Sequence, residues 1–168
     1  MRSAAALAAI LVALAAQTTL AGFVFRGGAA IDLVLIVVVY VAIKSGPVTG
    51  VLAGTVAGII QDSLSGGILG IGGLAKTVIG FLSGVLGTQF IVTAPLPRFL
   101  LLLVATALHS TIFMGLYSLL DLRQFPAPGP EIIGQAVGNA VVGVIAFQMI
   151  EWFPGFVDRR RAGRFLKR

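Results

Sequence analysis

Long apolar runs separated by short polar or glycine-rich breaks make up most of this chain. Six such runs can be read along it, at residues 4–24, 29–44, 47–62, 73–91, 99–120 and 132–152. A helix needs about 20 apolar residues to cross a hydrocarbon core of ~30 Å. An open strand cannot cross lipid, because its backbone polar groups would be left unpaired. The pattern therefore predicts an all-α integral membrane protein with six transmembrane helices.

Two of the runs allow a second interpretation. The run at 29–44 is β-branched and reaches only about 24 Å at 1.5 Å per residue, so a five-helix arrangement with one short re-entrant segment is the alternative. In the run at 4–24, Ala13-Leu14-Ala15 resembles the cleavage site of a signal peptide. This run is longer than a usual signal core and matches a membrane span. We therefore expect it to be retained as a helix.

Glycine and proline mark the expected breaks between helices. Residues 63–73 are rich in glycine and are expected to form a flexible connection, and residues 121–131 contain three prolines and are expected to form an irregular loop. Pro154-Gly155 is expected to end the last helix. The six-helix domain is then expected to cover residues 1–157, with a basic tail at 158–168.

Small residues recur at every fourth position within several runs. In lipid, this spacing lets two helix backbones approach closely, whereas in water each glycine would weaken a helix by about 1 kcal/mol relative to alanine. We therefore expect glycine-rich helix packing, with the third run facing the protein interior and apolar surfaces of other helices meeting partners. The glycines concerned are Gly46, Gly50, Gly54 and Gly58 in the third run, Gly80 and Gly84 in the fourth, and Gly134 and Gly138 in the sixth.

Composition supports a membrane protein and argues against nucleic-acid binding. The chain is 58% hydrophobic and 11% charged, whereas soluble domains carry about 25% charged residues. It has no cysteine, hence no disulfide and no thiolate metal site. The net charge of +6 is concentrated at the end, without a base-reading element beside it. We expect the basic tail to contact anionic lipid, with about 1 kcal/mol of binding free energy per basic residue, or to dock a protein. The basic residues of the tail are Arg159, Arg160, Arg161, Arg164, Lys167 and Arg168.

The distribution of lysine and arginine predicts the orientation in the membrane. With six helices both termini lie on one side, and that side would hold nine basic residues against three on the other. We therefore expect both termini to be cytoplasmic, in a multi-pass protein of the bacterial cytoplasmic membrane.

Few side chains suggest catalysis. His109 is the only histidine, and the adjacent Ser110 points about 100° away around a helix. A histidine hydrogen-bonded between helices is the preferred interpretation, and we expect no enzymatic activity, metal or cofactor. Asn139 is expected to hydrogen-bond across a close helix contact, worth about 1 kcal/mol in membranes; a ligand-binding role is the alternative.

Asp62 and Lys76 flank one short connection, and each is opposed by the dipole of its own helix. We expect them to pair with each other, or to engage a partner, and thereby to fix the connection. The alternative is that each extends separately to the membrane interface.

Three segments carry a resemblance to a known family. They are Asp32-Leu33-Val34-Leu35, Lys44-Ser45-Gly46-Pro47 and Gly58-Ile59-Ile60-Gln61-Asp62-Ser63-Leu64-Ser65-Gly66-Gly67-Ile68-Leu69-Gly70. With the chain length, helix count and basic end, they resemble the MreD family of bacterial rod shape-determining membrane proteins. The resemblance implies a non-enzymatic scaffold of the cell-elongation complex, which binds the single-span protein MreC. Through MreC it would act with RodA, the class B penicillin-binding transpeptidase and MreB in peptidoglycan synthesis.

The same family is similar in its six-helix fold to the S components of energy-coupling-factor transporters. This likeness supplies an alternative function, a small-molecule-binding subunit that works with an ATPase module. Such a site needs several polar or aromatic residues around one cavity. The chain has one Trp and two Tyr, and few polar residues inside its expected helices, so the scaffold is preferred.

Overall fold

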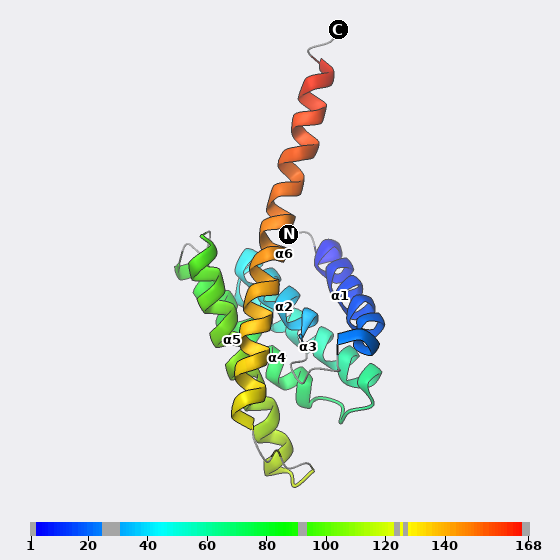
Figure 1. The fold of residues 1–168 in the computed structure, drawn as a ribbon, viewed down its shortest axis with the longest axis vertical. Coiled ribbons are helices and arrows are strands. Elements are labelled where there is room, and N and C mark those ends of the chain that lie inside the picture. The colour runs from blue at the N-terminus through cyan, green and yellow to red at the C-terminus, as the bar shows by residue number, and fades with distance from the viewer. Residues whose placement is uncertain (1–2, 25–30, 91–93, 123–124, 126–127, 166–168) are drawn as a thin grey trace.

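The computed structural model is a bundle of six helices (Figure 1). It describes residues 3–24, 31–90, 94–122, 125 and 128–165, with side chains described in 5–19, 31–90, 94–122, 125 and 128–152. The helices are α1 (Ser3–Val24), α2 (Leu33–Ser45), α3 (Pro47–Ser65), α4 (Ile71–Gln89), α5 (Pro95–Leu119) and α6 (Pro128–Phe165).

The all-helical fold agrees with the prediction, but the lengths of the helices differ. Four described helices, α3 to α6, are long and apolar enough to cross a membrane. The described apolar part of α1 (Ala5–Thr19) and the whole of α2 are shorter. Length and composition alone therefore support four spans among the described residues, where the sequence predicts six.

The short helix α2 is the centre of the bundle. It contacts each of the five other helices, and Val34, Leu35, Val38 and Val39 have no exposed surface. A helix that is apolar on all sides is typical of a fully buried position. At the start of α2 the N–H groups of Val34 and Leu35 donate to the side chains of Gln17 and Asp32, so protein groups and not lipid surround this end of the short helix.

Helices α3 and α4 form a hairpin whose backbones touch. A Cβ atom added at Gly50 would overlap the carbonyl of Gly80, and one added at Gly54 would overlap the backbone of Lys76. Likewise, a Cβ at Gly58 would lie against the backbone of Gly73. The side of α3 that carries these three glycines is thus turned toward α4 and away from lipid.

The remaining fourth-position glycines have different surroundings. Gly46 lies in the turn between α2 and α3 with a φ of 87°, a conformation that glycine adopts readily. Gly84 abuts the backbone of Pro47, whereas a Cβ at Gly138 would make only an ordinary contact, 3.6 Å from Ile31. In α6 it is Gly143 that lies tightly against another helix, at Leu102 of α5. The equal spacing of these glycines therefore does not give them equal roles.

Several expected helix boundaries are wrong by a few residues. Helix α3 continues to Ser65 and α4 begins at Ile71, so the connection is shorter than the expected 63–73. Left-handed Gly66 (φ 65°) and Gly70 (φ 101°) bound it, as is common at helix ends. Helices α5 and α6 begin at prolines, earlier than expected, because the first helical turn needs no N–H from its first residues.

The expectation that α6 ends at Pro154-Gly155 is also wrong. The helix continues to Phe165, and Figure 1 shows its last turns extending beyond the other helices. A proline removes one hydrogen bond from a helix and does not always end it. The basic residues up to Arg164 lie in this extension, but their side chains, and all of Lys167 and Arg168, lie outside the described residues. Their contact with lipid remains a prediction.

Candidate functional site

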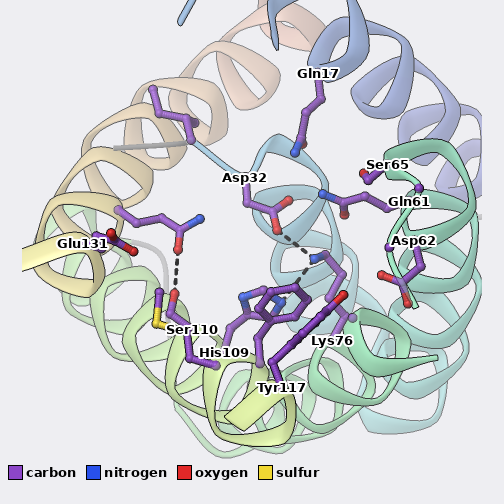
Figure 2. A pocket seen from close by; sticks show the side chains of 17 residues that line it. Gln17, Asp32, Gln61, Asp62, Ser65, Lys76, His109, Ser110, Tyr117 and Glu131 are labelled. Carbon is purple, nitrogen blue, oxygen red and sulfur yellow. Dashed lines mark hydrogen bonds and ion pairs between the residues drawn. The ribbon is translucent and has the colours of Figure 1, made fainter. Parts of the chain in front are cut away.

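A buried ion pair lies at one end of the central helix. Asp32 precedes α2 and Lys76 is on α4, and Lys76 Nζ lies 2.7 Å from Asp32 Oδ2. Lys76 Nζ is also 3.2 Å from Nε2 of His109 on α5 (Figure 2). Because an ammonium group can only donate, Nε2 accepts this hydrogen bond, and the neutral ring then carries its proton on Nδ1. All three residues are at most 5% exposed. The charges of Asp32 and Lys76 are therefore stabilised by each other and by hydrogen bonds within the protein.

A second set of hydrogen bonds ties this ion pair to α6. Asp32 Oδ1 accepts from the N–H of Leu35 at 2.9 Å and thereby caps α2. The N–H of Asp32 donates to Asn139 Oδ1 at 2.9 Å, and Asn139 Nδ2 donates to Thr106 Oγ1 at 3.2 Å. Asn139 on α6 thus contacts the start of α2 and the middle of α5. One polar network joins α2, α4, α5 and α6.

The expected pairing of Asp62 with Lys76 is wrong. Among the described residues, the carboxylate that Lys76 contacts is that of Asp32. Asp62 Oδ2 instead accepts hydrogen bonds from the N–H groups of Gly70 at 2.9 Å and Gly73 at 3.2 Å. The first N–H groups of a helix have no partner within it, and a carboxylate there complements the dipole of α4.

Neither side chain extends outward from the bundle, since Asp62 is 8% and Lys76 3% exposed. The two charges that the sequence places beside one connection therefore serve different structures. Asp62 holds the connection between α3 and α4, and Lys76 joins the buried network.

Replacement of Asp62 by alanine is expected to loosen the α3–α4 connection. Two backbone N–H groups would lose their acceptor, at a cost of about 1–3 kcal/mol. Hydrogen–deuterium exchange should then become faster at Gly70 and Gly73. Ser63→Ala is the matched control, because within the described part of the chain the hydroxyl of this exposed neighbour bonds to Ile59 O of its own helix alone. Unchanged exchange in Asp62→Ala would contradict this role.

A cavity of about 650 Å³ opens beside the buried ion pair. The prediction that few polar side chains converge on one cavity is wrong, because polar side chains from five helices and the segment before α2 meet here. Phe113, Met114 and Tyr117 of α5 add an apolar side. The polar side chains that line it (Figure 2) are Gln17, Asp32, Gln61, Asp62, Ser65, Lys76, His109, Ser110, Glu131 and Gln135.

The side chains of His109 and Ser110 contact different partners. The Ser110 hydroxyl donates to Gln135 Oε1 at 2.6 Å, whereas His109 Nε2 faces Lys76. Within the described residues, no group of three His, Cys, Asp or Glu side chains is placed to hold a metal ion.

A second ionic cluster lies near the start of α5. Glu151 of α6 accepts two hydrogen bonds from Arg98 Nη2, at 2.9 and 2.7 Å, and one from Lys44 Nζ at 2.8 Å. The guanidinium of Arg98 lies 5.5 Å from the ring centre of Phe147. Arg98 is 3% exposed although it is charged. The cluster links α2, α5 and α6.

In the sequence, Asp32 stands out only as part of a segment that resembles the MreD family, and Arg98 is only one of the nine basic residues counted for orientation. The signal that would have found them is general, because a charge within or beside an apolar span usually has a partner or a function.

Comparison with known proteins provides the family. The rod shape-determining protein MreD family matches residues 3–152, nearly the whole chain. Neither a curated protein nor a solved structure gives a significant match. The family match agrees with the segments that resemble MreD in the sequence, and it includes the ion pair, the cavity and all six helices up to the extension of α6. The chain belongs to the MreD family of rod shape-determining proteins.

Proposed function

We propose that this protein is a non-enzymatic membrane scaffold of the bacterial cell-elongation complex. It binds MreC within the membrane, and through MreC it helps to organise RodA, the class B penicillin-binding transpeptidase and MreB during peptidoglycan synthesis. The single observation that carries the proposal is the MreD family match over residues 3–152.

The packing of the bundle is suited to a scaffold. The backbones of α3 and α4 meet at Gly50 and Gly80. Ion pairs join the start of α2 to α4 and the end of α2 to α6, which in turn pairs with α5. Large apolar side chains remain exposed on the outer faces of several helices, among them Leu52, Phe81 and Val104. A rigid core with an apolar outer surface can present fixed docking faces to other membrane helices.

The protein is proposed to lie in the cytoplasmic membrane with both termini in the cytoplasm. Lys44 and Arg98 share one end of the bundle with Glu151, whereas Asp32, Asp62 and Glu131 line the cavity. An excess of basic residues on the cytoplasmic side is the general rule for membrane proteins. In this orientation the cavity opens toward the outer side of the membrane.

Direct binding to MreC tests the proposal. We expect the tagged protein, co-expressed with MreC from the same organism, to retain MreC at a constant ratio through purification in mild detergent. An unrelated single-span protein expressed at the same level serves as the control. Retention of MreC no better than that of the control would contradict the scaffold function.

A second candidate is the substrate-binding subunit of an energy-coupling-factor transporter. The observation in its favour is the cavity of about 650 Å³, which lies within the usual size range of ligand sites. A cavity does not require transport, and a scaffold can contain one. The two functions are distinguished by the proteins that purify with this one.

A further inference from the structure

We propose that the cavity beside the Asp32–Lys76 pair binds a small organic cation that also carries a hydrogen-bond acceptor. The inference goes beyond the scaffold function and does not depend on it, because the cavity is formed by this chain alone. Three features of the cavity support it: unpartnered buried polar atoms, the balance of charge, and an aromatic wall.

Two buried polar atoms at the cavity have no hydrogen-bond partner among the described residues. They are Nδ1 of His109 and Oε1 of Gln61. His109 is 95% buried, since only 5% of its surface is exposed, and the contact of Nε2 with Lys76 leaves Nδ1 as a donor. An unpaired buried donor is unfavourable, because it has lost its hydrogen bond to water. A ligand that presents an acceptor to Nδ1 would remove that cost.

The charge of the lining favours a cation over an anion. The lining contains three carboxylates, Asp32, Asp62 and Glu131, and one ammonium group, Lys76. With His109 neutral, these four groups sum to −2. Asp32 is neutralised by Lys76, so the net negative charge of the lining belongs to Asp62 and Glu131. Oδ1 of Asp62 has no hydrogen bond to a described residue, because Gly70 and Gly73 both donate to Oδ2.

An aromatic wall on α5 gives the cavity its apolar side. His109, Phe113 and Tyr117 are four residues apart and therefore share one face of the helix. The centres of the His109 and Phe113 rings are 6.0 Å apart, and those of Phe113 and Tyr117 are 4.8 Å apart. Such a wall accepts a flat or aliphatic ligand body, and aromatic faces attract cations. The acceptor of the proposed ligand can bind Nδ1 of His109, and its cationic head can lie near the carboxylates of Asp62 and Glu131. Its apolar body can pack against the aromatic wall of α5.

Three compounds of the same shape and different charge test the proposal. They are 4-(aminomethyl)benzamide, a cation; 4-methylbenzamide, which is neutral; and 4-carbamoylbenzoate, an anion. All carry the same amide acceptor. The purified full chain in lipid nanodiscs, labelled with ¹⁵N-histidine, reports binding at a single residue because His109 is the only histidine. We expect the cation to shift the Nδ1 resonance saturably and the anion to bind at least about tenfold more weakly.

Removal of the negative charge of Glu131, at the rim of the cavity, provides a second test of the proposal. Glu131 is exposed and lines the cavity, so Glu131→Gln should preserve the fold. It is expected to weaken binding of the cation about threefold or more while leaving the neutral compound unchanged. Asp121→Asn is the matched control. It removes the same charge from an exposed position outside the lining, and asparagine tolerates its φ of 55°.

Several results would overturn the proposal. They are an anion that binds as tightly as the cation, a cation that leaves Nδ1 unchanged at millimolar concentration, and equal effects of Glu131→Gln and Asp121→Asn. The peptide acetyl-Gly-Lys-Gly-amide tests a different occupant, the lysine side chain of a partner protein. Binding of this peptide without binding of 4-(aminomethyl)benzamide would assign the cavity to a protein partner and would also overturn the proposal.

Discussion

Replacement of Lys76 by methionine is expected to lower the free energy of unfolding by about 3–5 kcal/mol, because it leaves a buried carboxylate without its cation. Asp32 is 4% exposed, and its ion pair with Lys76 is 2.7 Å long. Methionine has a similar length and fills the same space, so the change removes mainly the charge. Thermal unfolding in detergent, followed by circular dichroism, measures the effect.

Two further variants separate the loss of a buried charge from the loss of any lysine. Lys44→Met breaks a more exposed pair with Glu151 and should cost no more than about 1 kcal/mol. The double variant Asp32→Asn with Lys76→Met removes both buried charges and should recover part of the stability lost in Lys76→Met. Equal costs for Lys76→Met and Lys44→Met would contradict the importance assigned to the buried pair.

The second large effect is expected at the contact between α3 and α4. Gly54→Ala should destabilise the protein by about 3 kcal/mol, since overpacking a filled site typically costs 1–3 kcal/mol and the added Cβ would overlap the backbone of Lys76. A backbone cannot move aside as a side chain can. The two helices would have to separate, and the Asp32–Lys76 pair would be displaced with α4.

A matched glycine elsewhere should respond in the opposite direction. A Cβ added at Gly115 of α5 would meet no atom within 4 Å, so Gly115→Ala should be neutral or should stabilise its helix by up to about 1 kcal/mol. Unfolding of both variants under the same conditions checks the pair of predictions. A Gly54→Ala variant as stable as Gly115→Ala would show that α3 and α4 do not pack as described.

Local patterns predict the helices well and their ends less well. The apolar runs place all six helices, because the cost of unpaired backbone groups in lipid leaves little choice of structure. Boundaries such as Ser65 and Pro128 depend on caps and on the first helical turn. These are contributions of about 1 kcal/mol, which the surrounding structure can override.

The buried network is harder to predict, because its members are distant in the sequence. Asp62 lies nearer to Lys76 along the chain, and proximity alone favours their pairing. In the structure the backbone N–H groups of Gly70 and Gly73 satisfy Asp62, and the start of α2 brings Asp32 to Lys76. The position of α2 at the centre of the bundle therefore determines that Lys76 pairs with Asp32 and not with Asp62. The cavity is hard to predict for the same reason, since its polar residues come from five different helices and from the segment before α2.

The most direct test of the scaffold function is purification of the tagged protein from its own membranes in mild detergent, with mass spectrometry of all retained proteins. We expect recovery of MreC together with cell-wall synthases. Recovery of a pair of ATPases with a coupling membrane subunit, in place of MreC, would contradict it and would make this protein the binding subunit of a transporter.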